Sequence, residues 1–204
     1  MSTVVVDYDA GNLRSVQTAL EHLGADYTVE REPAALKDAT RIVFPGVGDG
    51  AHAMSVLRTR GLDRAMQEQF AAGVPILGIC VGCQIVFDMT EEQNAVSLGL
   101  IPGRAARFPE RPGMKIPHMG WNTVRYTDGH WLFTGVPQDA SFYFVHSYYP
   151  LPQSDKYTIA LCDYGFPFAA AVERDNLVAT QFHPEKSGEA GLQVLRNFLQ
   201  RGVS

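Results

Sequence analysis

Strand-like and helix-like patterns of apolar residues alternate along the first 90 residues. Short β-branched or apolar runs predict strands, at residues 3–8, 26–30, 41–44 and 74–79. Helices are predicted between and after these strands, at residues 12–23, 51–72 and 80–89. The first helix places Leu13, Val16 and Leu20 on one face, and Gly61 is a candidate interruption of the second. This alternation is typical of a parallel sheet covered by helices on both faces.

The pattern changes after about residue 96. Runs rich in β-branched and aromatic residues, separated by Pro, Gly, Asp and Asn, predict antiparallel strands at 105–108, 122–126, 142–149, 158–163, 169–174 and 177–183. Asp175 and Asn176 form a predicted turn, and residues 188–200 a final helix. We therefore expect an α/β fold: a mixed, mainly parallel central sheet with helices on both faces and an added antiparallel β section. No repeat or linker is visible, so residues 1–204 are expected to form one domain.

Composition narrows the function classes. Apolar residues make up 46% and charged residues 19% of the 204 residues, which excludes a disordered chain or a coiled coil. The net charge of −5, without a basic stripe, argues against nucleic-acid binding. No apolar run reaches the ~18 residues needed to span a bilayer, and the N-terminus lacks the pattern of a signal peptide. With only three cysteines, the chain is expected to be cytoplasmic, with its cysteines as free thiols.

Cys80 lies in the sequence Gly78-Ile79-Cys80-Val81-Gly82, between a predicted buried strand and a predicted helix. This has the form of a nucleophile elbow, in which a tight turn lifts a nucleophile above the sheet. A helix beginning at Cys80 would favour its thiolate, and the Val81 N–H would be placed to stabilise an oxyanion. The sequence therefore predicts a catalytic thiol.

A buried structural cysteine in a Gly-rich turn is the alternative for Cys80. Cys83 and Cys162 lack a comparable setting and are expected to be structural. A redox pair of Cys80 and Cys83 fits the spacing but lacks a thioredoxin-like βαβ context. A zinc site is disfavoured because no second ligand pair has suitable spacing.

A thiolate nucleophile needs a histidine that moves its proton and a group that orients the histidine. His183 and Glu185 lie two residues apart at the end of a predicted strand, so their side chains are expected to face the same cleft. Pro184 favours an extended backbone at His183. A lone His-x-Glu usually marks a solvated strand end, and its combination with the elbow cysteine is what indicates a triad.

These motifs together resemble those of the class I glutamine amidotransferases, whose elbow reads G-x-C-x-G-x-Q and whose base lies in H-P-E. The order of Cys80, His183 and Glu185 matches, and the resemblance runs from end to end. Its most specific segments resemble the glutaminase subunits that supply a cyclase in histidine biosynthesis. They are residues 7–8, 11–15, 45–48, 117–122, 144–148 and 181–187.

The resemblance implies hydrolysis of L-glutamine through a Cys80 thioester, with no metal or organic cofactor. It implies that the partner is a (β/α)8-barrel cyclase in a heterodimer, which takes the released ammonia. Site roles follow residue by residue. The oxyanion donors would be Val81 with Val47 or Gly48; the substrate-binding residues would be Gln84, Glu92, Ser147 and Tyr148; and the docking residues would be Asn12, Arg14, Trp121 and Lys186.

Three alternatives stay open from the sequence. One is the glutaminase subunit of another amidotransferase, such as that of pyridoxal phosphate synthase, although the Pro45–Gly48 loop differs from the usual Gly-Gly-Glu-Ser. The second is a non-catalytic partner-binding module on the same fold. The third is a general cysteine peptidase.

Overall fold

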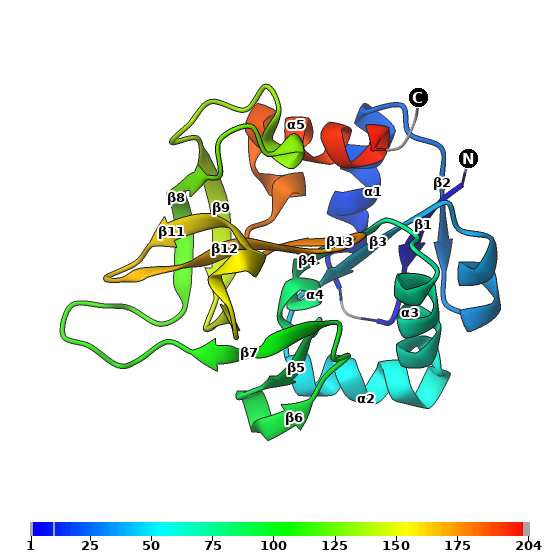
Figure 1. Ribbon diagram of the computed structural model, residues 1–204, viewed down its shortest axis with the longest axis horizontal. Helices are drawn as coiled ribbons and strands as arrows, with labels where there is room; N and C mark the ends of the chain where they lie inside the picture. The colour runs from blue at the N-terminus through cyan, green and yellow to red at the C-terminus, as the bar shows by residue number, and fades with distance from the viewer. Residues whose placement is uncertain (1, 10, 202–204) are drawn as a thin grey trace.

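A nine-stranded mixed sheet organises the molecule, seen in the computed structural model, which describes residues 2–9 and 11–201 (Figure 1). Five neighbouring strands are parallel: β2 (Tyr27–Glu30), β1 (Thr3–Val6), β3 (Arg41–Gly46), β4 (Ile76–Cys80) and β13 (Leu177–Thr180). Antiparallel strands continue the sheet: β12 (Pro167–Arg174), β11 (Thr158–Asp163), β8 (His118–Tyr126) and β9 (Ser141–His146). The predicted mixed sheet is confirmed, and five of its nine strands are parallel.

Helices cover both faces of the parallel half because its strands are apolar on both sides. Val4 and Val6 of β1 pack in the core formed with α2 (Gly50–Arg60) and α3 (Leu62–Ala71). Val5 packs in the opposite core, formed with α1 (Leu13–His22) and α5 (Gly188–Gln200). This alternation along one strand fixes which helices lie on which face.

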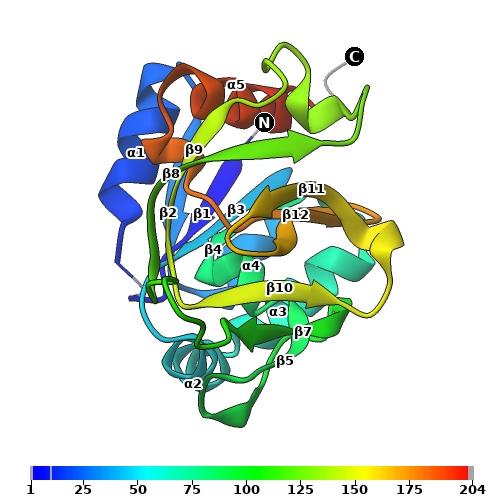
Figure 2. The same cartoon turned by 90° about the vertical axis from the view of Figure 1, so that its left-hand side faces the viewer.

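A second, four-stranded sheet lies beside the main one (Figure 2). Its strands, in spatial order, are β10 (Tyr148–Pro152), β7 (Ile101–Arg107), β5 (Phe87–Thr90) and β6 (Ala95–Val96). Because β10 follows β9 after a single residue, Ser147, the chain passes there from the main sheet to the second.

Several element predictions are confirmed. The last helix has the predicted bounds, the long second helix is broken at Gly61, which adopts φ 70°, and Asp175 and Asn176 connect β12 to β13. Three element predictions were wrong. The strand expected at 177–183 ends at Thr180. The helix expected at 80–89 is only α4 (Val81–Gln84), because Phe87–Thr90 leaves it to pair with β7, and the run 142–149 is divided between β9 and β10.

Candidate active site

Cys80 ends β4 and precedes α4, in a backbone conformation that side chains rarely adopt (φ 55°, ψ −103°). Two glycines make the turn possible. A Cβ added at Gly82 would lie 2.1 Å from the Phe44 carbonyl oxygen. A Cβ added at Gly78 would lie 2.9 Å from the Gly82 carbonyl oxygen. The backbone of α4 therefore packs directly on β3, and the elbow predicted from the sequence is present.

His183 and Glu185 contact each other next to this turn. His183 Nδ1 lies 2.7 Å from Glu185 Oε1, and both side chains are fully buried. The expectation that both side chains project from the end of one strand is wrong, because β13 ends at Thr180. Glu185 instead lies in a 3-10 turn, Pro184–Lys186, which brings its carboxylate next to the imidazole ring of His183. The carboxylate thus orients the imidazole, as a triad requires.

Asn12 supports this pair. Its side-chain amide donates a hydrogen bond to Glu185 Oε1 and lies 3.4 Å from His183 Nδ1. The sequence assigned Asn12 to docking, and its contacts point to a role in holding the Glu185 carboxylate.

Electrostatics favour a charged imidazole. Burial opposes the positive charge of His183, but the negative charge of a Cys80 thiolate and the Glu185 carboxylate outweigh it and raise the His183 pKa to about 10. Among the described residues, nothing hydrogen-bonds His183 Nε2, the nitrogen that faces away from Glu185. Cys80 and His183 are therefore suited to act as a thiolate and imidazolium pair.

A cavity of about 290 Å³ opens beside Cys80 and collects the predicted substrate-binding and oxyanion residues. Its lining comes from the loop after β3, the end of β4 with α4, the 3-10 turn after β5, the residue before β8, and the passage from β9 to β10. The residues are Val47, Gly48, Cys80, Val81, Gln84, Glu92, Pro117, Val145, His146, Ser147 and Tyr148. Every residue that the sequence assigned to substrate or oxyanion binding thus lines one cavity with Cys80.

The loop after β3 reaches the cavity because of strand register. Gly46 pairs with Cys80 across β3 and β4, which places Val47 and Gly48 next to the elbow. Gly48 has φ 97°, a conformation that favours glycine. Gly46 also packs closely, since an added Cβ would lie 2.0 Å from the Tyr8 hydroxyl and 3.1 Å from the Val81 Cβ, so a larger residue there would displace the Tyr8 side chain.

Two polar side chains at the site were not singled out from the sequence as site residues. Gln181 Nε2 lies 3.7 Å from Cys80 Sγ, and its Oε1 accepts a hydrogen bond of 3.1 Å from Gln84. His146 lines the cavity and is buried. Gln181 could have been found, because it lies two residues before His183 along the same extended segment.

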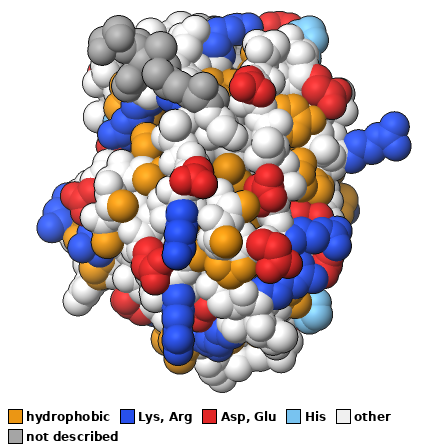
Figure 3. All heavy atoms as spheres, turned by 90° about the vertical axis from the view of Figure 1, so that its right-hand side faces the viewer, with side chains coloured by type: hydrophobic (Ala, Val, Ile, Leu, Met, Phe, Trp, Pro, Cys, Tyr) orange, Lys and Arg blue, Asp and Glu red, His pale blue; other side chains and the backbone are white. Residues whose placement is uncertain are grey.

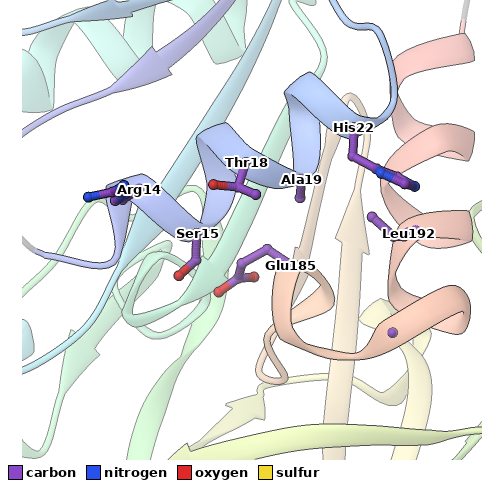
Figure 4. Close-up of a pocket in the computed structure, with 8 residues that line it drawn as sticks. Arg14, Ser15, Thr18, Ala19, His22, Glu185 and Leu192 are labelled. Carbon is purple, nitrogen blue, oxygen red and sulfur yellow. The ribbon is translucent and has the colours of Figure 1, made fainter.

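The residues assigned to docking are dispersed. Trp121 and its neighbour Met119 on β8 are 59% and 62% exposed, which is unusual for large apolar side chains. Lys186 follows Glu185 and is half-buried. Arg14 is exposed on α1 and lines a groove between α1 and α5. In Figure 4 its side chain points away from Glu185, whereas that of Ser15 points towards it.

The remaining cysteines fit a structural role. Burial raises the pKa of Cys83 well above its ordinary value and that of Cys162 to about 12. Within residues 2–9 and 11–201, no group of three His, Cys, Asp or Glu side chains is arranged to hold a metal ion. No helix in this part of the chain is long and apolar enough to cross a membrane. On the face in Figure 3, acidic and basic side chains are interspersed.

Comparisons with known proteins agree with this geometry. Residues 4–201 match the family "Glutamine amidotransferase class-I". The chain is 46% identical to the imidazole glycerol phosphate synthase subunit HisH of Nitratidesulfovibrio vulgaris (strain Miyazaki F), over 95% of this chain and 94% of that protein. It is 44% identical to HisH of Acinetobacter baylyi, over 98% of both chains.

Solved structures confirm the fold. PurLQS from Thermotoga maritima aligns with a TM-score of 0.76 at 21% identity, over 98% of this chain and 97% of that one. A putative GMP synthase component from Thermoplasma acidophilum aligns with a TM-score of 0.75 at 21% identity, over 98% and 92%. The chain belongs to the class-I glutamine amidotransferase family, and within it to the HisH glutaminase subunits of imidazole glycerol phosphate synthase.

Proposed function

We propose that this chain hydrolyses the side-chain amide of L-glutamine at Cys80 and passes the ammonia to a cyclase of (β/α)8-barrel fold in a heterodimer. The observation that carries the proposal is the cavity beside Cys80, with the buried His183–Glu185 pair next to the same turn. The reaction is an acyl transfer, for which a thiolate, a proton carrier and oxyanion donors suffice.

In the first half-reaction, the Cys80 thiolate attacks the carboxamide carbon of glutamine. The carbonyl oxygen becomes an oxyanion, for which the Val81 N–H and an N–H of the Val47–Gly48 loop are the donors. The imidazolium of His183 gives its proton to the amide nitrogen and the C–N bond breaks. Ammonia is released, and the acyl group remains on Cys80 as a thioester. Glu185 keeps the imidazole oriented throughout.

In the second half-reaction, His183 takes a proton from water, whose oxygen attacks the thioester carbon. The C–S bond then breaks, glutamate leaves, and the thiolate and imidazolium return. Bulk water would convert ammonia into ammonium, which is not nucleophilic, so a sheltered route to the cyclase suits this product. A reducing cytoplasm also suits a site whose nucleophile is a free thiol.

Acceptor oxygens define the substrate pocket. Glu92 Oε2 accepts the Gly50 N–H at 2.6 Å, which holds the carboxylate at the cavity wall, and burial raises its pKa. Both N–H groups of the Gln84 side chain are used, one by Tyr148 O and one by Gln181, so Gln84 offers its oxygen to the cavity. These oxygens suit the α-ammonium group of an amino acid.

The proposal is tested by measuring glutamate formed from glutamine, with and without the cyclase and its ligand, for the parent chain and Cys80→Ala. The parent is expected to produce glutamate, with the cyclase increasing the rate, and the variant none above background. Cleavage of peptides without glutamate formation from free glutamine would instead support a cysteine peptidase. Comparable activity in the Cys80→Ala variant would refute the thioester.

A further inference from the structure

A chain of buried hydrogen bonds connects β8 to the glutamine pocket. His118 and His146 are only 3% and 5% exposed, and His118 Nδ1 lies 3.0 Å from His146 Nε2. At one end, Asn122 Nδ2 lies 3.2 Å from His118 Nε2. At the other, His146 Nδ1 lies 2.7 Å from the Tyr148 carbonyl oxygen. The mechanism above uses neither histidine.

The two ends of this series of hydrogen bonds determine which atom donates in each bond. A carbonyl oxygen only accepts, so His146 Nδ1 must carry the hydrogen that Tyr148 O receives. A neutral His146 then has a bare Nε2, which can only accept from His118 Nδ1–H. The Nε2 of a neutral His118 is in turn bare and must accept from Asn122.

The hydrogen bonds of Asn122, at the other end of the series, independently give the same donor direction. The Asn122 side-chain oxygen accepts the Thr123 N–H at 2.8 Å, and its nitrogen donates to Asp163 O at 2.8 Å. This amide orientation makes Asn122 Nδ2 the donor to His118. Both rings are therefore neutral Nδ1–H tautomers. Burial agrees with neutrality, since it lowers the pKa of His118 to about 4 and of His146 to about 3.

The series of hydrogen bonds ends at the Tyr148 carbonyl oxygen, which also binds Gln84. Tyr148 O accepts from His146 and, at 3.1 Å, from Gln84 Nε2. The second N–H of Gln84 goes to Gln181, whose own Nε2 lies 3.7 Å from Cys80 Sγ. A fixed Tyr148 carbonyl thus keeps the Gln84 amide turned with its oxygen towards the cavity. If the amide turned over, an N–H₂ group would face the cationic end of the substrate.

We propose that His118 and His146 are positioning residues for the glutamine pocket, which fix the Tyr148 carbonyl and, through it, the orientation of the Gln84 amide. The role rests on the proposed function, because it acts on the substrate of that reaction. Neither ring takes part in proton transfer at Cys80. Their loss therefore weakens substrate binding more than the chemical step.

Two substitutions at His118 separate hydrogen bonding from packing. The His118 ring stacks on Phe144 and Tyr164, with centroid separations of 4.8 and 4.0 Å. His118→Phe keeps this stacking but cannot donate to His146. His118→Asn loses the stacking, but its amide nitrogen occupies roughly the place of Nδ1 and can still donate. A packing role predicts that the Asn variant is worse, and a hydrogen-bonding role predicts that the Phe variant is worse.

The measurement is inactivation of the full chain by a diazoketone analogue of glutamine that alkylates Cys80, followed at several concentrations. For His118→Phe we expect the half-saturating concentration to rise about tenfold, the usual effect of leaving one buried polar group unpaired, with a nearly unchanged limiting rate. For His118→Asn it should remain within about threefold of the parent. Equal half-saturating concentrations in parent and His118→Phe, or a larger increase in His118→Asn, overturn the proposal.

Nitrogen-15 NMR of histidine-labelled parent protein at pH 7.5 gives a second test that needs no variant. The proposal requires the neutral Nδ1–H tautomer for both His118 and His146, and an Nε2–H tautomer or a charged ring at either position overturns it. The two proposals also fail differently. A parent chain that the analogue does not alkylate at Cys80 refutes the proposed function, whereas the NMR result depends only on the hydrogen-bond chain.

Discussion

Cys80, the proposed nucleophile, has a strained backbone conformation. Its φ of 55° lies in the left-handed region, and its ψ of −103° takes it away from the conformation that asparagine and aspartate tolerate there. Such strain costs about 1–3 kcal/mol and persists where the surrounding structure enforces it, here through the packing of Gly78 and Gly82. The strained turn keeps Sγ at the cavity, beside His183 and Gln181.

The strain can be measured by replacing the residue. Cys80→Gly is expected to unfold at a higher temperature than Cys80→Ala, by an amount corresponding to about 1 kcal/mol, because glycine adopts positive φ without steric cost. Thermal unfolding of the two variants, both inactive, checks this. Equal unfolding temperatures would show that the turn is not strained.

The His183–Glu185 pair predicts a pH dependence of stability. The pKa of His183 is raised in the folded state, so its contribution is fully present below about pH 6.5, the ordinary histidine value, and is lost as the pH rises towards about 10. Glu185→Gln removes one cause of the shift. The parent should therefore lose more unfolding free energy between pH 6.5 and 10 than Glu185→Gln does, as measured by urea unfolding at several pH values. A larger loss in the variant would contradict the charged pair.

At the scale of elements, the elbow depends on how closely α4 approaches β3. The four residues Val81–Gln84 are too few to form a stable helix alone, and contact with the Phe44 carbonyl leaves no room for a side chain at residue 82. The site is thus assembled by tertiary packing rather than by helix propensity.

Gly82→Ala tests this packing. The added Cβ would lie 2.1 Å from the Phe44 carbonyl oxygen, so β3 and α4 must separate. We therefore expect the free energy of unfolding to fall by about 3 kcal/mol or more, and glutaminase activity to be lost. Cys83→Ala, in the same short helix, is the matched control and should cost about 1 kcal/mol. Denaturant unfolding compares them, and similar stability in both variants would argue against the close approach.

The same packing explains which elements could be predicted from the sequence. Helix α5 and the break at Gly61 follow from local periodicity and a glycine, and they are predicted correctly. The apolar run after Cys80 predicts a helix because a buried strand and a buried helix look alike over ten residues. What decides between them is the pairing of β5 with β7, whose residues lie more than ten positions later in the chain.

The residues of the site likewise fall into those that the sequence predicts and those that it does not. Cys80, His183 and Glu185 are predicted from motifs, because the proposed chemistry requires particular residue types in a particular order. His118, His146 and Gln181 lie inside the segments that carry the resemblance, but nothing in the sequence assigns their side chains to the site, except that Gln181 lies two residues before His183. They meet only because β8, β9 and the segment after β13 are brought together by the fold. Asn12 and Glu185 are likewise separated by most of the chain.

At the scale of the whole molecule, the exposed apolar pair Met119 and Trp121 on β8 marks the expected cyclase-docking surface. It lies on the strand that also carries His118, near the active-site cavity lined by Pro117. Large exposed aromatic side chains at an interface often contribute most of the binding energy. The ammonia would then be released close to its consumer.

Trp121→Ala is therefore expected to weaken binding of the cyclase by at least about tenfold, or roughly 1.4–3 kcal/mol, in titration calorimetry. Val96→Ala is the matched control, because Val96 is a similarly exposed apolar residue, at 64%, on the distant strand β6. Lys186→Ala is expected to reduce activation by the cyclase, since Lys186 directly follows the triad. If Trp121→Ala and Val96→Ala bind alike, docking does not use the β8 face.

The central claim is that Cys80 forms a covalent bond to the side-chain carbon of glutamine. It is tested most directly by treating the full chain with the diazoketone analogue and locating the added mass by peptide mass spectrometry. We predict one adduct, on Cys80, that excess glutamine prevents. Cys83 and Cys162 should stay unmodified because they do not line the cavity and their thiol pKa values are raised. An adduct mainly on Cys83 or Cys162, or none on Cys80 in folded protein, would contradict the account.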